Sequence, residues 1–368
     1  MKITIERGAL LKALNHVQSV VERRNTIPIL ANVLLSAENG QLSLTATDLD
    51  IEIVEGVPAD TASHGGTTAS AHMMYDIVRK LPDGAQVEIS HDQATGKVTL
   101  VAGRSRFALQ SLPREDFPAA AAGDLPYSFD LTTKELFRLV EKTRFAISTE
   151  ETRYYLNGIY LHTVDGKLRA VATDGHRLAR VDMELPHGAD GMPGIIVPRK
   201  TVTELLKLLE ASDGTVSVAV SDTKIRFVVG DVTLTSKLID GTFPDYDRVI
   251  PSENDKTMEV DGKLFAAAVD RVSTISTERS RAVKLDLDDG RVTLAVNNPD
   301  SGSATEELGV DYKGDALEIG FNARYLLDIT QQLDGAAAHF ELSDAGSPTV
   351  VRDSDDPHAL YVLMPMRV

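Results

Sequence analysis

The 368-residue sequence contains no cysteine, which excludes disulfide bonds, thiolate metal sites and cysteine nucleophiles. It also lacks any apolar stretch close to the roughly 18 residues that a membrane-spanning helix needs. Its first residues, MKITIERGALLKALNHV, have no continuous apolar core of the signal-peptide kind. We therefore expect a cytoplasmic protein without a membrane partner.

Basic residues are scarce, since 38 Lys and Arg face 55 Asp and Glu, for a formal charge of −17. This balance argues against a general nucleic-acid binder, which usually has a basic surface. Net charge does not say where charges lie, however, and an acidic exterior can hide a basic inner surface. Basic residues do gather in segments that we expect to be helical or to flank helices: Arg23, Arg24, Lys134, Arg138, Lys142, Arg144, Arg199, Lys200 and Lys207.

Common catalytic and cofactor motifs are missing too. There is no GxSxG, HExxH, GxxxxGK[ST] or GxGxxG. The nine histidines are scattered without metal-ligand spacing, and DLDDG at 286–290 lacks the downstream Glu of a calcium loop. We therefore expect no metal and no cofactor.

What the sequence does contain is an internal repeat. GQLSLTATDLDIEIV starts at Gly40 and GKLRAVATDGHRLAR at Gly166, 126 positions later, and the same offset separates Pro118 from Pro244. A fainter third copy starts at Gly290. Proline, glycine and charge collect near 123–127 and 251–256. The pattern predicts three similar domains, at 1–122, 127–250 and 251–368.

Each repeat is expected to run strand, helix, strands, helix, strands, which makes an α+β protein with two helices packed on antiparallel sheets in each domain. The second helices are predicted at 71–81, 198–210 and 322–333, from apolar residues at helical spacing. Helix starts are marked by capping residues: Thr132 with Glu135, Thr201 with Glu204, and Asn322.

The segment ATDGHRLAR, at 172–180, resembles a catalytic cluster because Asp174, His176 and Arg177 could act as acid, base and anion clamp. Its counterpart ATDLDIEIV keeps the Ala-Thr-Asp core without the histidine or arginine. The shared core is better interpreted as a structural turn, since Asp readily bonds to its own turn backbone. The additions in the middle repeat then point to binding. The chain end YVLMPMRV is apolar and methionine-rich, which suits a peptide-binding edge.

Several segments together resemble one family, the bacterial DNA sliding clamp, which is the beta subunit of DNA polymerase III. They span the whole chain: NTIPILANVLL, TDLDIEI, GRSRFALQSLP, RYYLNG, VATDGHRLA, VPRK, SKLIDGTFPDY and MPMRV. The resemblance implies a clamp fold whose three domains form a ring as a head-to-tail homodimer around double-stranded DNA, without sequence specificity. It also implies partners that bind through short linear motifs, namely the polymerase III alpha subunit, the clamp loader delta subunit, other polymerases and repair proteins.

The same resemblance implies a pocket for a glutamine followed by hydrophobic residues. Its residues would be Leu156, Thr173, Gly175, His176, Arg177, Leu178, Pro244, Val249, Asn322, Tyr325, Val362, Met364, Pro365, Met366 and Arg367. His176 and Arg177 would serve as walls and hydrogen-bond donors. Gly346 stands where the family often has a larger apolar residue, so that edge is expected to be shallower.

DNA contacts are implied for Arg24, Tyr154, Tyr155, Arg199 and Lys200, while Glu150 departs from the neutral polar residue of the family. For the dimer seam, the resemblance places Phe107 and Leu109 against Ile275. It pairs Arg106 with an acid such as Glu306 or Glu307.

Two other functions remain open from the residues alone. One is an enzyme that uses Asp174 and His176. The other is a peptide-binding scaffold that forms no ring. A stable monomer would favour the scaffold, and a turnover lost in His176→Ala with peptide affinity intact would favour the enzyme.

Overall fold

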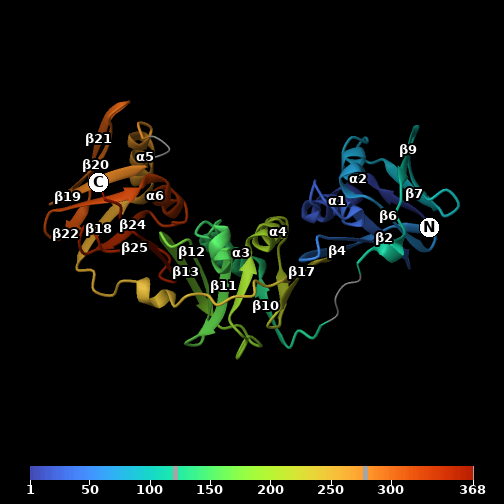
Figure 1. Cartoon of the computed structure of the whole chain (residues 1–368), viewed down its shortest axis with the longest axis horizontal. Coiled ribbons are helices and arrows are strands. Elements are labelled where there is room, and N and C mark those ends of the chain that lie inside the picture. Colours follow the sequence, from blue (N-terminus) through green and yellow to red (C-terminus); the bar gives the residue numbers. More distant parts are fainter. Residues whose placement is uncertain (119–122, 277–280, 368) are drawn as a thin grey trace. The chain divides into compact units, whose positions relative to one another are not determined.

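The computed structural model describes residues 1–118, 123–276 and 281–367 (Figure 1). By their contacts, these residues divide into two compact units. The first unit comprises Met1–Phe137, Pro186–Pro193 and Lys200–Leu238. The second comprises Arg138–Leu185, Gly194–Arg199 and Ile239–Val368. The middle of the chain therefore contributes to both units.

Two antiparallel sheets form the first unit. One has the spatial order β5 (Asp60–Ser63), β1 (Lys2–Glu6), β7 (Gln86–Asp92), β8 (Lys97–Ala102) and β9 (Ser105–Gln110). The other has the order β10 (Tyr127–Thr132), β15 (Thr215–Val220), β16 (Lys224–Val229), β17 (Val232–Lys237), β4 (Ile51–Pro58), β3 (Gln41–Thr47), β2 (Asn32–Glu38) and β6 (Gly65–Ser70).

Two further antiparallel sheets form the second unit. The larger has the order β14 (Ile195–Pro198), β11 (Gly158–Val164), β12 (Lys167–Thr173), β13 (Arg177–Glu184), β26 (Ala359–Leu363), β25 (Thr349–Asp353), β24 (Ala337–Leu342), β18 (Lys256–Asp261) and β22 (Asp311–Lys313). The smaller has the order β21 (Gly302–Gly309), β20 (Arg291–Asn298), β19 (Ala282–Asp288) and β23 (Leu317–Asn322).

The described residues form six α-helices, two in each repeat as the sequence predicts. They are α1 (Arg7–Val20), α2 (Ala71–Val78), α3 (Thr133–Arg144), α4 (Arg199–Glu210), α5 (Gly262–Ser273) and α6 (Ala323–Thr330). Helix α1 packs against α2 and against β3 and β4, and α5 packs against α6 (Figure 1). Four short 3-10 helices accompany them: η1 (Pro28–Ala31), η2 (Arg114–Asp116), η3 (Glu151–Leu156) and η4 (Tyr246–Val249).

Apolar residues at the expected spacing build the core. In α1, Leu10, Leu14 and Val17 are fully buried, and in β3 the alternate residues Leu42 and Leu44 are too. Burying one such side chain stabilises the fold by about 1.5–3 kcal/mol. The helical period of 3.6 and the strand period of 2 thus both direct apolar side chains into the space between helices and sheets.

Neighbouring repeats are joined by continuous backbone ladders. Strand β4 of the first repeat pairs with β17 of the second, with Ile53 opposite Leu234. Strand β13 of the second repeat pairs with β26 of the third, with Leu178 opposite Val362. Each joint therefore rests on main-chain hydrogen bonds as well as on side-chain packing.

The predicted helix caps had mixed outcomes. The amide of Thr132 donates to the Glu135 carboxylate at 2.8 Å and the Glu135 amide donates back to the Thr132 hydroxyl at 3.2 Å, which confirms that capping box. Asn322 caps α6 as predicted. The box at Thr201 was wrong because α4 begins earlier, and the buried Thr201 hydroxyl bonds to Ser236 instead.

No described helix is long and apolar enough to cross a membrane.

Candidate functional site

The ATDGHRLAR segment forms a tight turn between β12 and β13. The Thr173 hydroxyl donates to the Arg177 carbonyl at 2.7 Å and accepts from the Gly175 amide at 3.1 Å. The Asp174 carboxylate accepts from the amides of His176 and Arg177, at 2.9 and 3.1 Å. Threonine and aspartate therefore close the turn through their side chains.

The first repeat builds the same turn. The Thr47 hydroxyl donates to the Ile51 carbonyl at 2.9 Å, and the Asp48 carboxylate accepts from the amides of Asp50 and Ile51, at 2.9 and 2.8 Å. This match confirms the interpretation of the Ala-Thr-Asp core as a structural turn. A carboxylate that is committed to closing a turn is poorly suited to act as a general acid.

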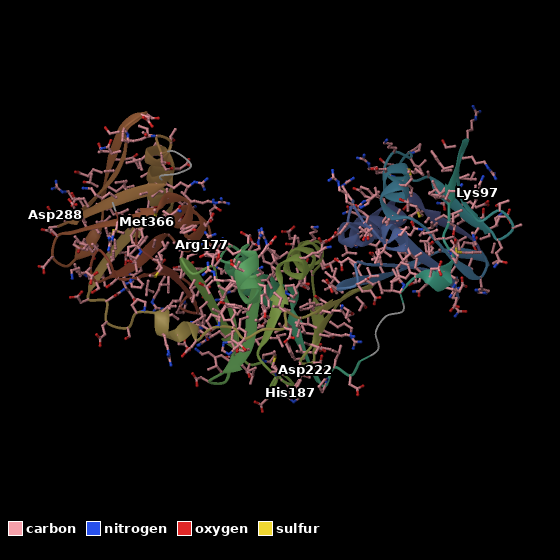
Figure 2. The ribbon with its side chains drawn as sticks, in the orientation of Figure 1. Lys97, Arg177, His187, Asp222, Asp288 and Met366 are labelled. Atoms are coloured by element: carbon pink, nitrogen blue, oxygen red, sulfur yellow. The ribbon has the colours of Figure 1, made fainter. Side chains whose placement is uncertain are left out.

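Arg177 is held on all sides and is 9% exposed. Its guanidinium nitrogens donate to Asp174 at 3.1 Å, to the Phe145 carbonyl at 2.7 Å and to Asp328. The guanidinium also lies 4.3 Å from the centre of the Tyr325 ring. Each nitrogen already donates to a group of the chain, so Arg177 (labelled in Figure 2) fixes the turn and forms a wall rather than reaching for a ligand.

Beside this turn lies a cavity of about 300 Å³ in the second unit. Many of the residues predicted for the pocket line it: Leu156, Thr173, Gly175, Arg177, Leu178, Pro244, Val249, Val362 and Met364. Its lining is mainly apolar, with Leu156, Leu178 and Val362 continuing into a buried cluster. Val249 is 49% exposed and Met364 39% exposed, so apolar surface faces solvent at the rim. Such a cavity suits apolar side chains of a ligand.

Four lining residues were not among the predicted pocket residues: Arg153, Tyr155, Asp245 and Tyr246. Arg153 donates to the Asp174 carbonyl at 2.9 Å and to Glu150 at 2.8 Å. Their signal was present in part, because they stand in the segments RYYLNG and SKLIDGTFPDY that carry the family resemblance.

The other predicted pocket residues do not line the cavity. His176 stacks on Tyr325 at 6.4 Å, and its carbonyl accepts from the Met364 amide at 2.9 Å. Asn322 caps α6, and the Met366 amide (Figure 2) donates to the Gly320 carbonyl at 2.8 Å. Pro365 lies between the two methionines, and Arg367 is exposed. Their part in binding stays a prediction.

Three family models match the chain in succession. They describe the N-terminal, central and C-terminal domains of the DNA polymerase III beta subunit, at residues 1–121, 130–245 and 247–367. The chain belongs to the DNA polymerase III beta subunit family. The recognition made from the sequence and the three-domain clamp fold are therefore confirmed.

Relatives in this family match over the full length. The beta sliding clamp of Caulobacter vibrioides is 58% identical over 372 residues, and that of Escherichia coli K12 is 41% identical, each covering 100% of both chains. A solved Bartonella birtlesii clamp bound to griselimycin has a TM-score of 0.98 at 55% identity, covering 100% of both chains. A solved Caulobacter crescentus clamp has a TM-score of 0.98 at 58% identity, covering 100% of this chain and 99% of that one.

The residues predicted to contact DNA have different environments. Tyr154 is 52% exposed, with its ring edge-on to that of Tyr155 at 5.8 Å. Arg24 and Arg199 are exposed. Lys200 is bound to Asp48 and to Glu22 within the first unit. Its charge is thus already compensated, whereas the Tyr154 ring can still stack on a base.

The predicted seam residues lie near sheet edges. Strand β9, which carries Arg106, Phe107 and Leu109, is an edge of the five-stranded sheet. Strand β21, which carries Glu306, is an edge of the four-stranded sheet. Glu306 already pairs with Arg271 at 2.5 Å, and Ile275 lies just after α5.

Two remaining positions were singled out from the sequence. A Cβ added at Gly346 would meet only the Asp344 carboxylate, at 3.5 Å, so the backbone there has room for a larger residue. The Glu150 carboxylate forms an ion pair with Arg153 at 2.8 Å. Within the described residues no group of three or more His, Asp or Glu side chains is placed to hold a metal.

Proposed function

We propose that the chain is a DNA sliding clamp that acts as a head-to-tail homodimer, closed as a ring of six domains around double-stranded DNA. The observation that carries this proposal is the full-length match to all three domain models of the family. We keep the domain boundaries 1–122, 127–250 and 251–368 as part of it. A ring needs no base readout, because topology alone retains it on DNA.

The two exposed sheet edges support the dimer. An edge strand presents unpaired backbone groups and readily pairs with another chain. Strand β9 lies in the first repeat and β21 in the third, so a head-to-tail pair of chains can join β9 of one to β21 of the other at two seams. Phe107 and Leu109 would be buried there, and Arg106 would join an acidic cluster that Arg271 already shares.

The cavity beside β13 supports a role as a tether for partners. It would take the hydrophobic residues of short linear motifs, while the glutamine would bond at the edge near His176 and Met364. The motifs would come from the polymerase III alpha subunit, the clamp loader delta subunit, other polymerases and repair proteins. A ring held on DNA would thereby keep a polymerase at its template.

The charges of the helices are compatible with weak DNA contacts. Several basic side chains in these helices are already paired within the chain: Arg138, Lys142, Arg144, Lys200 and Lys207. Each strong phosphate contact would release counterions and slow sliding through added affinity. Partial neutralisation would therefore favour a ring that moves.

Retention on circular DNA tests the proposal. The protein, loaded onto nicked circular DNA by a clamp loader, should stay bound through gel filtration and be lost after the DNA is linearised by a restriction enzyme. Equal retention on both forms would contradict a topological link. A protein that is released from both forms, and that is monomeric at micromolar concentration, would favour the peptide-binding scaffold without a ring.

The enzyme hypothesis is disfavoured by the geometry of the turn, where Asp174 closes the backbone and binds Arg177. We propose that the chain performs no chemistry of its own. We expect the His176→Ala variant to bind peptide more weakly, and we expect no catalytic turnover in either the wild type or this variant.

A further inference from the structure

Tyr246 lines the pocket, and its hydroxyl is hydrogen-bonded to two residues that do not line it. It opens η4, the short helix that also brings Val249 to the cavity, and it is 6% exposed. Its hydroxyl lies 3.1 Å from the Arg169 guanidinium and 2.9 Å from His162 Nε2. Neither Arg169 nor His162 lines the cavity.

The direction of these two hydrogen bonds follows from the donors available. Arg169 can only donate, and two of its nitrogens already donate to the Asp182 carboxylate, at 2.7 and 3.0 Å. The third donates to the Tyr246 oxygen. The Tyr246 proton then points to His162 Nε2, which can accept it only when the imidazole is neutral. Arg169 therefore donates a hydrogen bond to Tyr246, and Tyr246 donates one to His162.

The sheet places these side chains together. His162 on β11 and Arg169 on β12 are directly opposite each other, as are Arg169 and Asp182 on β12 and β13. The His162 ring stacks on Tyr160 at 4.5 Å, and Tyr160 stacks on Phe243 at 4.8 Å. His162 and Arg169 thus lie on paired strands of the sheet, whereas Tyr246 lies in the connecting segment Pro244–Val249.

We propose that His162 and Arg169 are positioning residues of the peptide pocket, which hold Tyr246 and the segment at 244–249 in the place that a bound peptide requires, and that protonation of His162 weakens this hold by removing the acceptor of the Tyr246 proton. This inference rests on the proposed role of the cavity as a peptide site.

The charges around His162 decide the direction of the pH effect. Burial lowers the pKa of His162 and the adjacent Arg169 lowers it further, while Asp247 on η4 and Asp182 on β13 act in the opposite sense. Arg180 on β13 lies 3.8 Å from Asp247. Because the folded-state pKa of His162 is below the usual value of about 6.5, its hydrogen bond with Tyr246 is intact above pH 6.5 and is lost as the pH falls through the folded-state value, while the bond from Arg169 remains.

Peptide binding by Tyr246→Phe and His162→Gln tests the inference. The probe is a fluorescein-labelled synthetic peptide of glutamine followed by leucines and phenylalanine, titrated at about pH 7.5 and at successively lower pH down through the NMR titration midpoint of His162. Tyr246→Phe removes the hydroxyl and keeps the ring, so the Kd at pH 7.5 should rise roughly three- to tenfold. His162→Gln retains an acceptor that does not titrate, so its Kd should stay close to wild type at pH 7.5 and should change less than that of wild type as the pH falls through the His162 midpoint.

Two controls separate other sources of pH dependence. His176 is a second histidine in the turn beside the cavity, so the wild-type profile is compared with that of His176→Gln, in which the His162 component should remain. His187→Gln changes an exposed histidine of the other compact unit (labelled in Figure 2) and should bind as wild type does. A Tyr246→Phe variant with unchanged Kd, or a His162→Gln variant that keeps the full wild-type pH profile, would overturn the inference.

A measurement without peptide keeps the two proposals distinguishable. Tyr246→Phe removes the partner of the neutral imidazole, so the NMR titration midpoint of His162 should move upward. Failure of wild-type protein to bind the peptide at any pH would overturn the proposed pocket function itself. An unmoved midpoint would overturn the hydrogen-bonded chain whether or not the peptide binds.

Discussion

The turn of the middle repeat has a positive φ at position 175, a backbone conformation that favours glycine. Gly175 has φ of +88°, and the equivalent Leu49 adopts φ of +80° although it carries a side chain. A bulky residue at positive φ is strained. At Gly175 the space is also limited, because an added Cβ would lie 2.5 Å from Arg153 Nη1. The two repeats therefore solve one backbone geometry with different residues.

Gly175→Ala should weaken both the fold and the pocket. The positive φ costs alanine about 1 kcal/mol, and the contact with Arg153 adds to it by displacing a side chain that lines the cavity. Gly166→Ala is the matched control, since Gly166 has φ of +69° and no atom within 4 Å of an added Cβ. Urea unfolding and peptide titration of both variants measure the difference. If both variants lose the same stability and neither loses affinity, the Arg153 contact has no effect.

At this scale the family resemblance named many of the residues that line the cavity, whose role in binding stays a prediction, but it did not name the groups behind them. Leu178 stands in VATDGHRLA and Met364 in MPMRV, two segments that carry the family resemblance. The hold on Tyr246 could not be predicted, because His162 and Arg169 reach it only through the register of β11 and β12. No spacing in the sequence indicates that a tyrosine from a connecting segment meets that pair.

At the scale of elements, α3 is anchored to the third repeat by ion pairs. Arg138 binds Asp356 through two nitrogens, at 3.1 and 2.6 Å, and Lys142 donates to the Gln332 carbonyl at 2.7 Å. Burial alone would raise the pKa of Asp356, but the hydrogen bonds and charge of Arg138, with Lys142 nearby, hold that pKa below its usual range.

Asp356→Asn should therefore destabilise the second unit in a pH-dependent way. We expect about 1–3 kcal/mol lower free energy of unfolding at pH 7, because the charge-assisted bonds of Arg138 are weakened. A depressed pKa stabilises the fold above the unfolded value of about 3.9 and ceases to do so as pH falls through the folded value. The difference between the wild type and the variant should begin to shrink below about pH 4 and disappear only as the pH falls through the lower folded-state value, as urea unfolding at several pH values would show. A difference that stays constant down to pH 3 would assign the loss to packing.

Helix positions were predictable because apolar spacing and capping residues coincide at most of them. The capping box predicted at Thr132 is formed because this threonine lies just before the first residue of α3. The Thr201 box failed because Pro198 ends β14 and α4 begins directly after it, so the threonine falls inside. Ion pairs such as that of Arg138 with Asp356 link residues far apart in the sequence, so local sequence patterns do not predict them.

At the scale of the whole molecule, the proposed ring depends on apolar side chains at the edge strand β9. Phe107→Asp should convert the dimer to monomer, because an unpaired carboxylate would be buried at the seam. Ala108→Asp is the matched control, since neighbouring residues of a strand point to opposite faces. Analytical ultracentrifugation at micromolar concentration distinguishes the species, with thermal unfolding as a check on folding. A Phe107→Asp variant that remains dimeric would contradict this seam.

The second prediction at this scale concerns salt. A protein that binds through about six to ten phosphate contacts loses roughly 10³–10⁵ in affinity between 50 and 200 mM salt. A closed ring is retained by topology, so the half-life on nicked circular DNA should change little over that range. A steep loss on circular DNA would show that electrostatic attraction, and not closure, retains the protein.

The repeat offset predicted three domains, and the family match bears that out. It did not predict that β4 and β17, or β13 and β26, would pair into sheets shared by neighbouring repeats. Periodicity identifies strands but not their partners, because pairing between distant segments depends on the packing of the whole unit.

The pairing of β13 with β26 also sets an order on biosynthesis. One wall of the pocket is made at 177–184 and another at 359–363 and the residues just after, so about half the chain is synthesised between the two. At roughly 5–20 residues per second, the first wall waits on the order of ten seconds or more for the second. A nascent chain cannot therefore offer its pocket to a partner until the last strand has left the ribosome and paired, and truncated products would be unable to compete for partner motifs.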